Sequence, residues 1–239
     1  RRLRGLHQEG APYPAAAALS DSCRLLHRLA VALVFVVALL CCLPAADAPF
    51  TFDEHAGIED NRVVHPGASF TEALRYRYSP DQARPVFFSS LLLDADLWGL
   101  KPRAFRLTGF FIHLACGAIL YLLLRRPHGT ATVARTAPAL AAAAPAAPAA
   151  LAGTALFLLH PLQSESVLYI WGRSEILSTL FGLLAVLLAL AADDHKTAAG
   201  HPHLFLAGAV ACMALALASK EEAVAIPVIF YIWWRWAEG

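Results

Sequence analysis

The chain has 239 residues, of which 58% are hydrophobic and 15% are charged, and its formal net charge at pH 7 is +1. A soluble domain of this length carries more charge and fewer apolar residues, and a nucleic-acid-binding domain carries a clear basic excess. Both classes are therefore excluded, and the composition predicts an all-α protein whose helices lie in a lipid bilayer.

Six apolar segments are predicted to cross the membrane and to form one polytopic helical bundle. A full span needs about 20 residues, so the second and fourth segments fit well, while the fifth and sixth are short. The third contains Pro145 and Pro148, which a membrane helix tolerates when its neighbours satisfy the freed carbonyl groups. In chain order the predicted spans are Leu29–Ala46, Ala104–Leu124, Leu140–Leu159, Glu175–Ala192, Leu204–Ala218 and Ala223–Trp236.

Residues 1–28 are predicted to form a cytoplasmic tail, and residues 29–239 a single membrane domain with a first outer loop at residues 47–103. Basic residues concentrate on the cytoplasmic side of membrane proteins, and five arginines precede the first apolar segment. A cleaved signal peptide is the alternative, because the stretch AADA has the small residues of a cleavage site. The segment is long for a signal sequence and further spans follow it, so an uncleaved membrane anchor is preferred.

This orientation places most of the polar clusters on the outer face of the membrane. The outer segments are residues 47–103, His160–Glu175 and Ser219–Glu222, whereas Asp193–His203 lies inside. Ionisable side chains close to lipid cost several kcal/mol unless they are paired or serve a function. The sequence therefore predicts a functional site where the outer segments meet.

Asp53 and Glu54 follow the first apolar segment closely and form an adjacent acidic pair. Two carboxylates can divide acid–base work, with one accepting a proton while the other orients a group or a cation. The alternative interpretation is the solvated start of a loop. The pair is the candidate catalytic centre.

The segment Ser79–Trp98 is predicted to form a short amphipathic helix along the membrane interface. Its apolar or interfacial bulk comes from Phe87, Phe88, Leu91, Leu92 and Trp98. Arg84 lies near its beginning, where a guanidinium and a helix N-terminus can together hold a phosphate group. Alternatively, Arg84 extends toward lipid headgroups.

Further candidates lie in the other two outer segments. His160 ends the third span beside a proline and is predicted to face water or a ligand, and Glu165 follows it. Lys220 interrupts an apolar stretch, together with Glu221 and Glu222. A lysine there either extends to the interface or neutralises an anion such as a lipid phosphate.

Two charged residues at the start of the fourth span, Arg173 and Glu175, are predicted to hold each other. His113, inside the second span, is interpreted as a polar contact within the bundle. The five cysteines form no CxxC pair, and neither metal-ligand spacing nor a nucleotide-binding glycine loop occurs. The sequence therefore predicts no metal and no bound cofactor.

Five stretches of the chain resemble a known family. In order they are FDEHAGIEDN, RPVFFSSLLLDADLWGL, IHLACGAILYLLL, LFLLHPLQSESVLYIWGRSEIL and SKEEAVAIP. They are similar to the N-terminal membrane half of the transmembrane-and-tetratricopeptide-repeat protein O-mannosyltransferases, which belong to the GT-C superfamily of polytopic glycosyltransferases. The resemblance covers most of the chain from Phe50 onward, and its most specific part is HPLQSESV with the following GRSE.

The resemblance implies transfer of a sugar, typically mannose, from a polyprenyl-phosphate carrier to a Ser or Thr hydroxyl of an acceptor protein outside the cytoplasm. The lipid-linked donor is then a co-substrate, and no cofactor is needed. The family's catalytic carboxylate maps onto Asp53, with Glu54 beside it. The resemblance maps donor-phosphate binding onto Arg84, His160 and Lys220, and a supporting role onto Glu165, Arg173, Glu175 and Glu221.

The chain departs from the family in its second span. Relatives often have His and Asn where this chain has Arg106 and Gly109, whereas His113 is kept. The difference weakens any role assigned to the upper part of this helix. Tetratricopeptide repeats are expected after such a membrane domain. The chain is therefore predicted to be the N-terminal part of a longer protein, with a GT-C-like bundle that is truncated at its C-terminus.

Two alternatives to a glycosyltransferase remain open at the level of sequence. A transporter or flippase for a lipid-linked or anionic solute also gathers polar groups in a helical bundle, but it favours charges near the bilayer midplane and internal repeats. No inverted repeat is visible in the sequence. A non-catalytic membrane anchor for downstream repeats is the second alternative.

Overall fold

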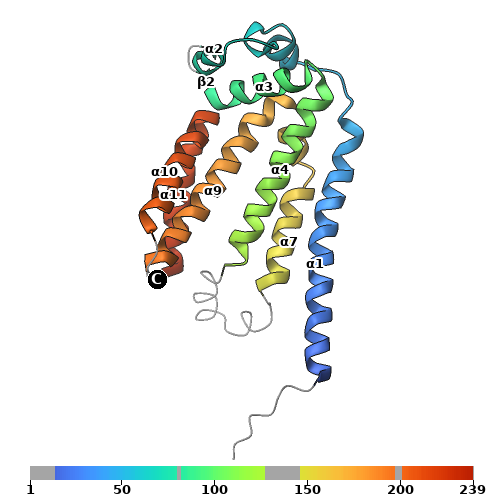
Figure 1. The fold of residues 1–239 in the computed structure, drawn as a ribbon, viewed down its shortest axis with the longest axis vertical. Coiled ribbons are helices and arrows are strands. Elements are labelled where there is room, and N and C mark those ends of the chain that lie inside the picture. The colour runs from blue at the N-terminus through green and yellow to red at the C-terminus, as the bar shows by residue number, and fades with distance from the viewer. Residues whose placement is uncertain (1–13, 80–81, 127–145, 197–200, 239) are drawn as a thin grey trace, which may run out of the picture.

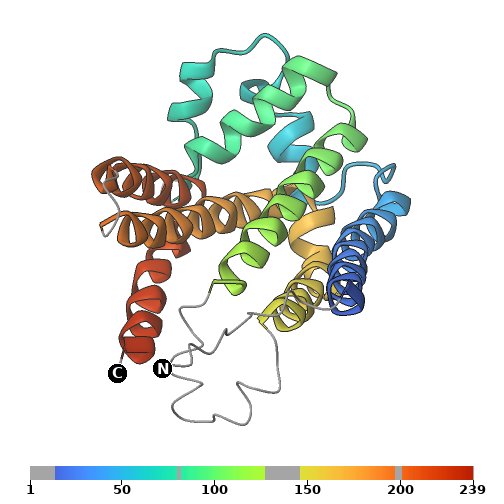
Figure 2. The same ribbon diagram turned by 60° about the horizontal axis from the view of Figure 1, so that its bottom comes forward.

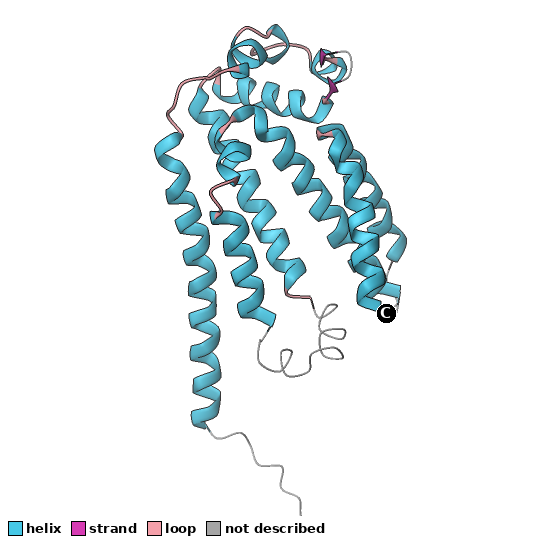
Figure 3. Ribbon diagram, turned by 180° about the vertical axis from the view of Figure 1, so that it is seen from behind, coloured by secondary structure: helices cyan, strands magenta, loops and turns pink. Residues whose placement is uncertain are grey.

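The computed structural model describes residues 14–79, 82–126, 146–196 and 201–238, and it is a bundle of long helices beneath a cap of short ones (Figure 1). Figure 3 shows that helices dominate the described residues and that the two short strands lie in the cap. The long helices of the bundle are α1 (Pro14–Cys42), α4 (Pro102–Leu124), α7 (Ala146–Leu159), α9 (Arg173–Lys196), α10 (Pro202–Ser219) and α11 (Ala225–Glu238).

Four of the described helices are long and apolar enough to cross a membrane, as expected of an integral membrane protein. They cover Ser22–Ala45, Pro102–Leu124, Ile170–Asp193 and Pro202–Ser219 and confirm the first, second, fourth and fifth predicted spans as long apolar helices. The third predicted span begins outside the described residues, and its described part, α7, has 14 residues. The sixth, α11, also has 14 residues. The count of six spans therefore stays a prediction.

The first helix begins earlier than the sequence analysis predicted. α1 starts at Pro14, so the second half of the predicted tail, residues 14–28, is helical and continuous with the span. Alanine and leucine favour the helix, and a proline in its first turn costs no hydrogen bond. The helix stops before Pro44, which lies in the 3-10 turn η1 (Leu43–Ala45).

The cap is the segment between α1 and α4, and it contains the short helices that were predicted for the first outer loop. Its two strands pair antiparallel, with Arg77 opposite Ala83 and Ser79 opposite Gln82. In chain order the elements of the cap are η2 (His55–Glu59), η3 (Arg62–Val64), α2 (Phe70–Arg75), β1 (Arg77–Ser79), β2 (Gln82–Ala83) and α3 (Pro85–Trp98).

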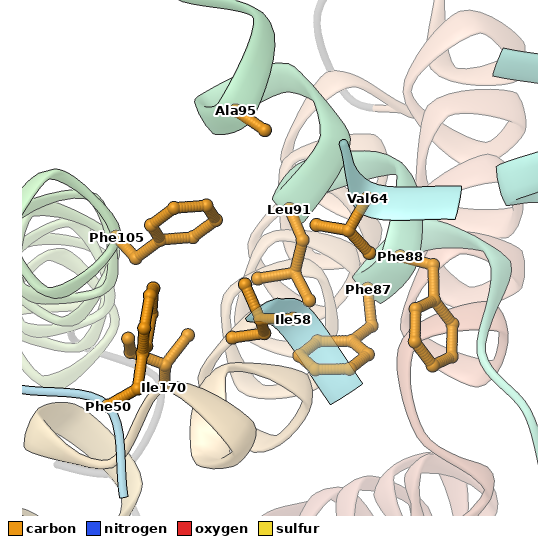
Figure 4. Close-up of a cluster of buried hydrophobic side chains, with 9 residues drawn as sticks. All are labelled: Phe50, Ile58, Val64, Phe87, Phe88, Leu91, Ala95, Phe105 and Ile170. Carbon is orange, nitrogen blue, oxygen red and sulfur yellow. The ribbon is translucent and has the colours of Figure 1, made fainter. Parts of the chain in front are cut away.

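The prediction for the segment Ser79–Trp98 is wrong in two respects. The helix begins at Pro85, because Ser79 belongs to the hairpin. Most of the side chains predicted for the membrane interface are also not available to it, since Phe87, Phe88 and Leu91 are buried in the core of the cap (Figure 4), whereas Trp98 is exposed. Each such burial stabilises the fold by about 1.5–3 kcal/mol. The same cluster includes Phe50, Ile58, Val64, Ala95, Phe105 and Ile170, so the core joins the cap to the bundle.

Helix α4 lies in the middle of the bundle and packs against both α7 and α9. α9 and α10 run side by side, and α1 lies at the edge of the bundle beside α7 (Figure 2). Between α7 and α9 the chain forms α8 (Gln163–Leu168) and η5 (Ile170–Gly172), and between α10 and α11 it forms η6 (Glu221–Val224). α9 starts and α10 ends near the cap, so α8, η5 and η6 lie at the cap end of the bundle (Figure 1).

A close approach fixes the cap on this end. Trp171 of η5 makes edge-on ring contacts with Phe87 and Tyr78 of the cap. Gly57 faces the same indole, and a Cβ atom added there would lie 1.9 Å from the ring. Only glycine leaves room for this contact, so the start of the cap is held directly against η5.

Candidate functional site

The polar segments that were predicted to meet do lie together, at the cap end of the bundle. Hydrogen bonds connect the start of the cap with α8 and η5, and connect α3 and α9 with η6. Three contacts make these connections: Tyr169 Oη to Asp53 Oδ2 at 3.3 Å, Lys220 Nζ to Glu175 Oε1 at 2.9 Å, and Arg84 Nη2 to Glu221 Oε1 at 3.1 Å.

Asp53 is exposed and borders an open hollow of about 710 Å³. Glu165, Arg106 and Tyr169 also line this hollow. The Tyr169 hydroxyl donates a hydrogen bond to Asp53. Partial burial and the nearby Asp53 charge raise the pKa of Tyr169, so the hydroxyl stays protonated and remains a donor at neutral pH.

The residue before Asp53 has an unusual backbone conformation. Phe52 has φ of 50°, in the left-handed region that non-glycine residues rarely adopt, and its side chain is 86% exposed. Such strain persists where surrounding contacts fix the backbone, and it is frequent at functional sites. Here it turns the chain so that Asp53 points outward while Glu54 points into the protein.

Glu54 differs completely from its neighbour, because it is fully buried. Its Oε1 accepts a hydrogen bond of 2.6 Å from the backbone N–H of Ile170. Its Oε2 accepts bonds from the N–H of Thr51 at 2.9 Å and from Arg106 Nη2 at 3.1 Å. Glu54 is therefore a fixed anion that ties the cap to α4 and η5.

Arg106, to which the sequence analysis gave no role, is the centre of this arrangement. Besides Glu54, it donates to the backbone carbonyl groups of Leu168 at 3.0 Å, Pro49 at 2.8 Å and Ala48. The sequence did contain an indication, since an arginine one turn into an apolar helix requires a partner. The buried guanidinium joins α4, the start of the cap and α8.

Arg173 is also buried, and the predicted pairing with Glu175 is wrong. Its Nη2 lies 2.7 Å from Asp94 Oδ2 and donates to the carbonyl of Phe105 at 2.5 Å. Thr108 donates to the other oxygen of Asp94 at 2.9 Å. Burial raises the pKa of Asp94, against the opposing effect of the Arg173 charge. Residues 173 and 175 point to different sides of α9, because neighbours on a helix surface are three or four positions apart.

The remaining charged candidates form one group, which we call the charged cluster: Arg84, Glu175, Lys220, Glu221 and Glu222. Lys220 Nζ lies between Glu175 at 2.9 Å and Glu222 at 2.7 Å. Burial lowers the pKa of Lys220, but its hydrogen bonds to the two carboxylates outweigh that effect and raise it. The hydrogen bond from Arg84 lowers the pKa of Glu221. Both cations of the cluster are thus paired with acids.

His160 lies apart from the charged cluster. Its Nδ1 accepts a hydrogen bond from the N–H of Leu162 at 3.2 Å, and it borders a smaller hollow of about 130 Å³. That hollow shares Ser164 and Leu168 with the hollow at Asp53. The structure therefore does not bring the three predicted phosphate ligands to one point, and it places His160 beside the Asp53 hollow.

Two further observations complete the site. His113 is buried between helices, with its Nε2 3.4 Å from the carbonyl of Leu158, which confirms its interpretation as a contact within the bundle. Across the described ranges, no group of three or more His, Cys, Asp or Glu side chains is arranged to hold a metal ion.

Comparison with known proteins finds a distant relative. Over 215 aligned residues the chain is 23% identical to protein O-mannosyl-transferase Tmtc3 of Drosophila melanogaster, and the alignment covers 84% of the chain. The chain spans only 23% of the length of that protein. No family model and no solved structure matches the chain. The similarity supports a distant relationship to the family that the sequence motifs resemble.

Proposed function

We propose that this chain is the N-terminal membrane part of a glycosyltransferase that transfers a sugar from a polyprenyl-phosphate donor to Ser or Thr hydroxyls of proteins. The similarity to a protein named as an O-mannosyl-transferase supports this class and favours mannose as the sugar. One structural observation carries the proposal. Of two adjacent carboxylates, Asp53 is exposed to water beside a hollow, whereas Glu54 is buried and held by hydrogen bonds.

In the proposed reaction Asp53 acts as a general base. Its carboxylate accepts the proton of the acceptor hydroxyl while that oxygen attacks the anomeric carbon of the sugar. The bond between this carbon and the phosphate oxygen breaks, and the polyprenyl phosphate leaves with the bonding electron pair. General-base assistance of this kind contributes about 10²–10⁴ in rate.

Glu54, Arg106 and Tyr169 are assigned positioning roles. The ion pair of Glu54 with Arg106 fixes the backbone on which Asp53 lies, and the Tyr169 hydroxyl holds one oxygen of Asp53. Holding a reacting group in one orientation removes part of the entropic barrier of the reaction. Although the sequence analysis predicted Glu54 as catalytic, its oxygens are already occupied by donors, which favours a positioning role.

For the donor phosphate we propose His160 at the neighbouring hollow, and Lys220 and Arg84 by exchange of partners. The carboxylate side chains that hold these two cations are open to water, with Glu222 71% and Glu221 56% exposed. Lys220 and Arg84 themselves are only 15% and 11% exposed, so each cation stays in place while its exposed carboxylate partner moves away to admit a phosphate group. The cations would then stabilise the charge that develops on the leaving phosphate.

Replacement of Asp53 tests the proposal. Membranes that contain the whole protein are incubated with a radiolabelled polyprenyl-phosphate sugar and an acceptor peptide. Asp53→Asn keeps the shape but removes the base, so transfer should fall by about 10² or more. Asp60→Asn, which alters another exposed aspartate at the start of the cap, is the matched control and should transfer normally.

The same assay separates the other hypotheses. Normal transfer by Asp53→Asn overturns the catalytic assignment. Label that crosses the membrane without reaching the peptide indicates a flippase, and label that does neither in the unaltered protein indicates a non-catalytic anchor.

A further inference from the structure

Another hollow, separate from those at Asp53 and His160, lies at the end of the bundle opposite Asp53. It has a volume of about 600 Å³ and is formed where α1, the last turn of α4 and the start of α7 come together (Figure 1). Neither the sequence motifs nor the proposed sugar transfer assigns it a role.

Arginines dominate the polar lining of this hollow. Arg24 and Arg28 come from α1 and are one turn apart, so they lie on the same face of the helix, and Arg125 comes from the end of α4. Among the residues that the structure describes, no acidic side chain lines the hollow. Within the described residues, Arg28 and Arg125 form no ion pair, and both are exposed. The described lining is therefore basic, and Arg28 and Arg125 are the two cations available to a ligand.

Ring contacts build the inner wall. His27 of α1 lies 2.7 Å from the hydroxyl of Tyr121 of α4, and this hydrogen bond ties the two helices together. The guanidinium of Arg125 lies over the same Tyr121 ring, 5.4 Å from its centroid. The position of one arginine is thus fixed by an aromatic ring on the inner wall.

Apolar surface continues from the hollow along α1. Val31 lines the hollow, and only 6% of the apolar span of α1 is buried inside the bundle. Leu29 and Leu33, which follow Arg28 on α1, are more than half exposed. A ligand that fits this surface carries an anionic group at one end and hydrocarbon at the other.

We propose that this hollow binds an anionic phospholipid, with the phosphate of the headgroup at Arg28 and Arg125 and the acyl chains along α1. Basic pockets between membrane helices bind such headgroups, and a guanidinium presents two parallel N–H donors to phosphate oxygens. The predicted orientation places this end in the cytoplasm, where the membrane leaflet carries anionic lipid. The site does not depend on the proposed sugar transfer.

Lipid binding to the purified protein in an uncharged detergent tests this site by native mass spectrometry. Dioleoyl phosphatidylglycerol should bind in preference to the zwitterionic phosphatidylcholine of the same chains. The double variant Arg28→Gln with Arg125→Gln should weaken phosphatidylglycerol binding by about 30-fold, since each basic residue near the surface contributes about fivefold. Arg28→Lys with Arg125→Lys keeps both charges and should retain most of the affinity.

A matched control removes two exposed arginines from the cap end. Arg62→Gln with Arg75→Gln should leave phosphatidylglycerol binding unchanged. Equal binding of the two lipids, or equal loss in this control, overturns the proposal. Displacement of phosphatidylglycerol by inorganic phosphate alone also overturns it and identifies the hollow as a site for a free anion. Because sugar transfer is not measured, this result is independent of the test on Asp53.

Discussion

Two systems of ion pairs lie at the cap end of the bundle, and they differ in their exposure to water. In the first, both partners are buried: the side chains of Arg106 and Glu54 are 4% and 0% exposed, and those of Arg173 and Asp94 are 1% and 5% exposed. In the charged cluster the carboxylates are between 46% and 71% exposed, whereas Lys220 and Arg84 are only 15% and 11% exposed. The basic side chains are therefore mostly buried in both systems, and the acidic side chains are buried in one and exposed in the other.

This difference in burial separates the ion pairs that hold the fold together, which we call the framework, from the charged cluster, whose members can exchange partners. A buried ion costs several kcal/mol in lost hydration, which is tolerated only when hydrogen bonds satisfy its remaining donors and acceptors. The carbonyl groups of Ala48, Pro49, Leu168 and Phe105 provide those bonds. In the charged cluster the acid of each pair is in contact with water, which can hydrate the carboxylate when it moves away for a ligand. The two fully buried pairs are therefore structural, and the charged cluster is available to bind a ligand.

The largest effect is expected from breaking a buried pair. Arg106→Met leaves Glu54 charged and unpaired inside the protein and should destabilise the fold by about 3–5 kcal/mol. The midpoint of thermal unfolding in detergent should fall by roughly 10 °C, and the double variant with Glu54→Leu should recover much of that loss.

The exposed Arg62 provides the control for this experiment. Arg62→Met, also in the cap region, should change stability by no more than about 0.5 kcal/mol. An Arg106→Met protein that melts like the original would show that the buried pair is not part of the framework.

Much of the bundle was predictable because its determinants are local. The lengths and hydropathy of the apolar stretches were sufficient to predict α4, α9 and α10 as long apolar helices. The core of the cap was not predictable, because an apolar stripe such as that of Phe87 and Leu91 can face either lipid or protein. Only the distant partners Val64 and Ile170 decide that it faces protein.

The candidate site was predictable as a region but not in its contacts. The sequence brought the right segments to one end, yet it placed both Asp53 and Glu54 in the catalytic centre and did not show that Glu54 is buried while Asp53 is exposed. That distinction depends on the turn at Phe52 and on Arg106, which lies 52 positions from Glu54 in the chain. Asp94, which pairs with Arg173, was missed for the same reason, since the contact joins distant segments.

A smaller effect on stability, but a large one on function, is expected from the charged cluster. Lys220→Met should change the free energy of unfolding by less than about 1 kcal/mol, because its partners are exposed carboxylates. If Lys220 exchanges its carboxylates for the donor phosphate, the kcat/KM for the donor should fall by about tenfold or more, since a charge-assisted hydrogen bond contributes about 1.5–3 kcal/mol.

The matched control removes a competitor of the phosphate instead of the cation. Glu222→Gln frees Lys220 from one partner and should leave the KM for the donor unchanged or lower it. A Lys220→Met protein that is destabilised by several kcal/mol yet has an unaltered KM for the donor would assign this lysine to the framework.

The smallest effect is the pH dependence that the charged cluster adds to stability. The pKa of Lys220 is raised above its ordinary 10.5, so its contribution is complete below pH 10.5 and is lost as the pH rises through the raised pKa. The pKa of Glu221 is lowered below 4.5, so its contribution is present above pH 4.5 and is lost as the pH falls through the lowered pKa. The difference in unfolding midpoint between the protein and Lys220→Gln should stay within about 3 °C and vanish at alkaline pH, and also at acid pH where the carboxylate of Glu175 is protonated. The corresponding difference for Glu221→Gln should vanish only at acid pH. Differences that disappear near neutral pH would mean that these pairs do not form in solution. The contrast between the buried ion pairs and the charged cluster would then be wrong.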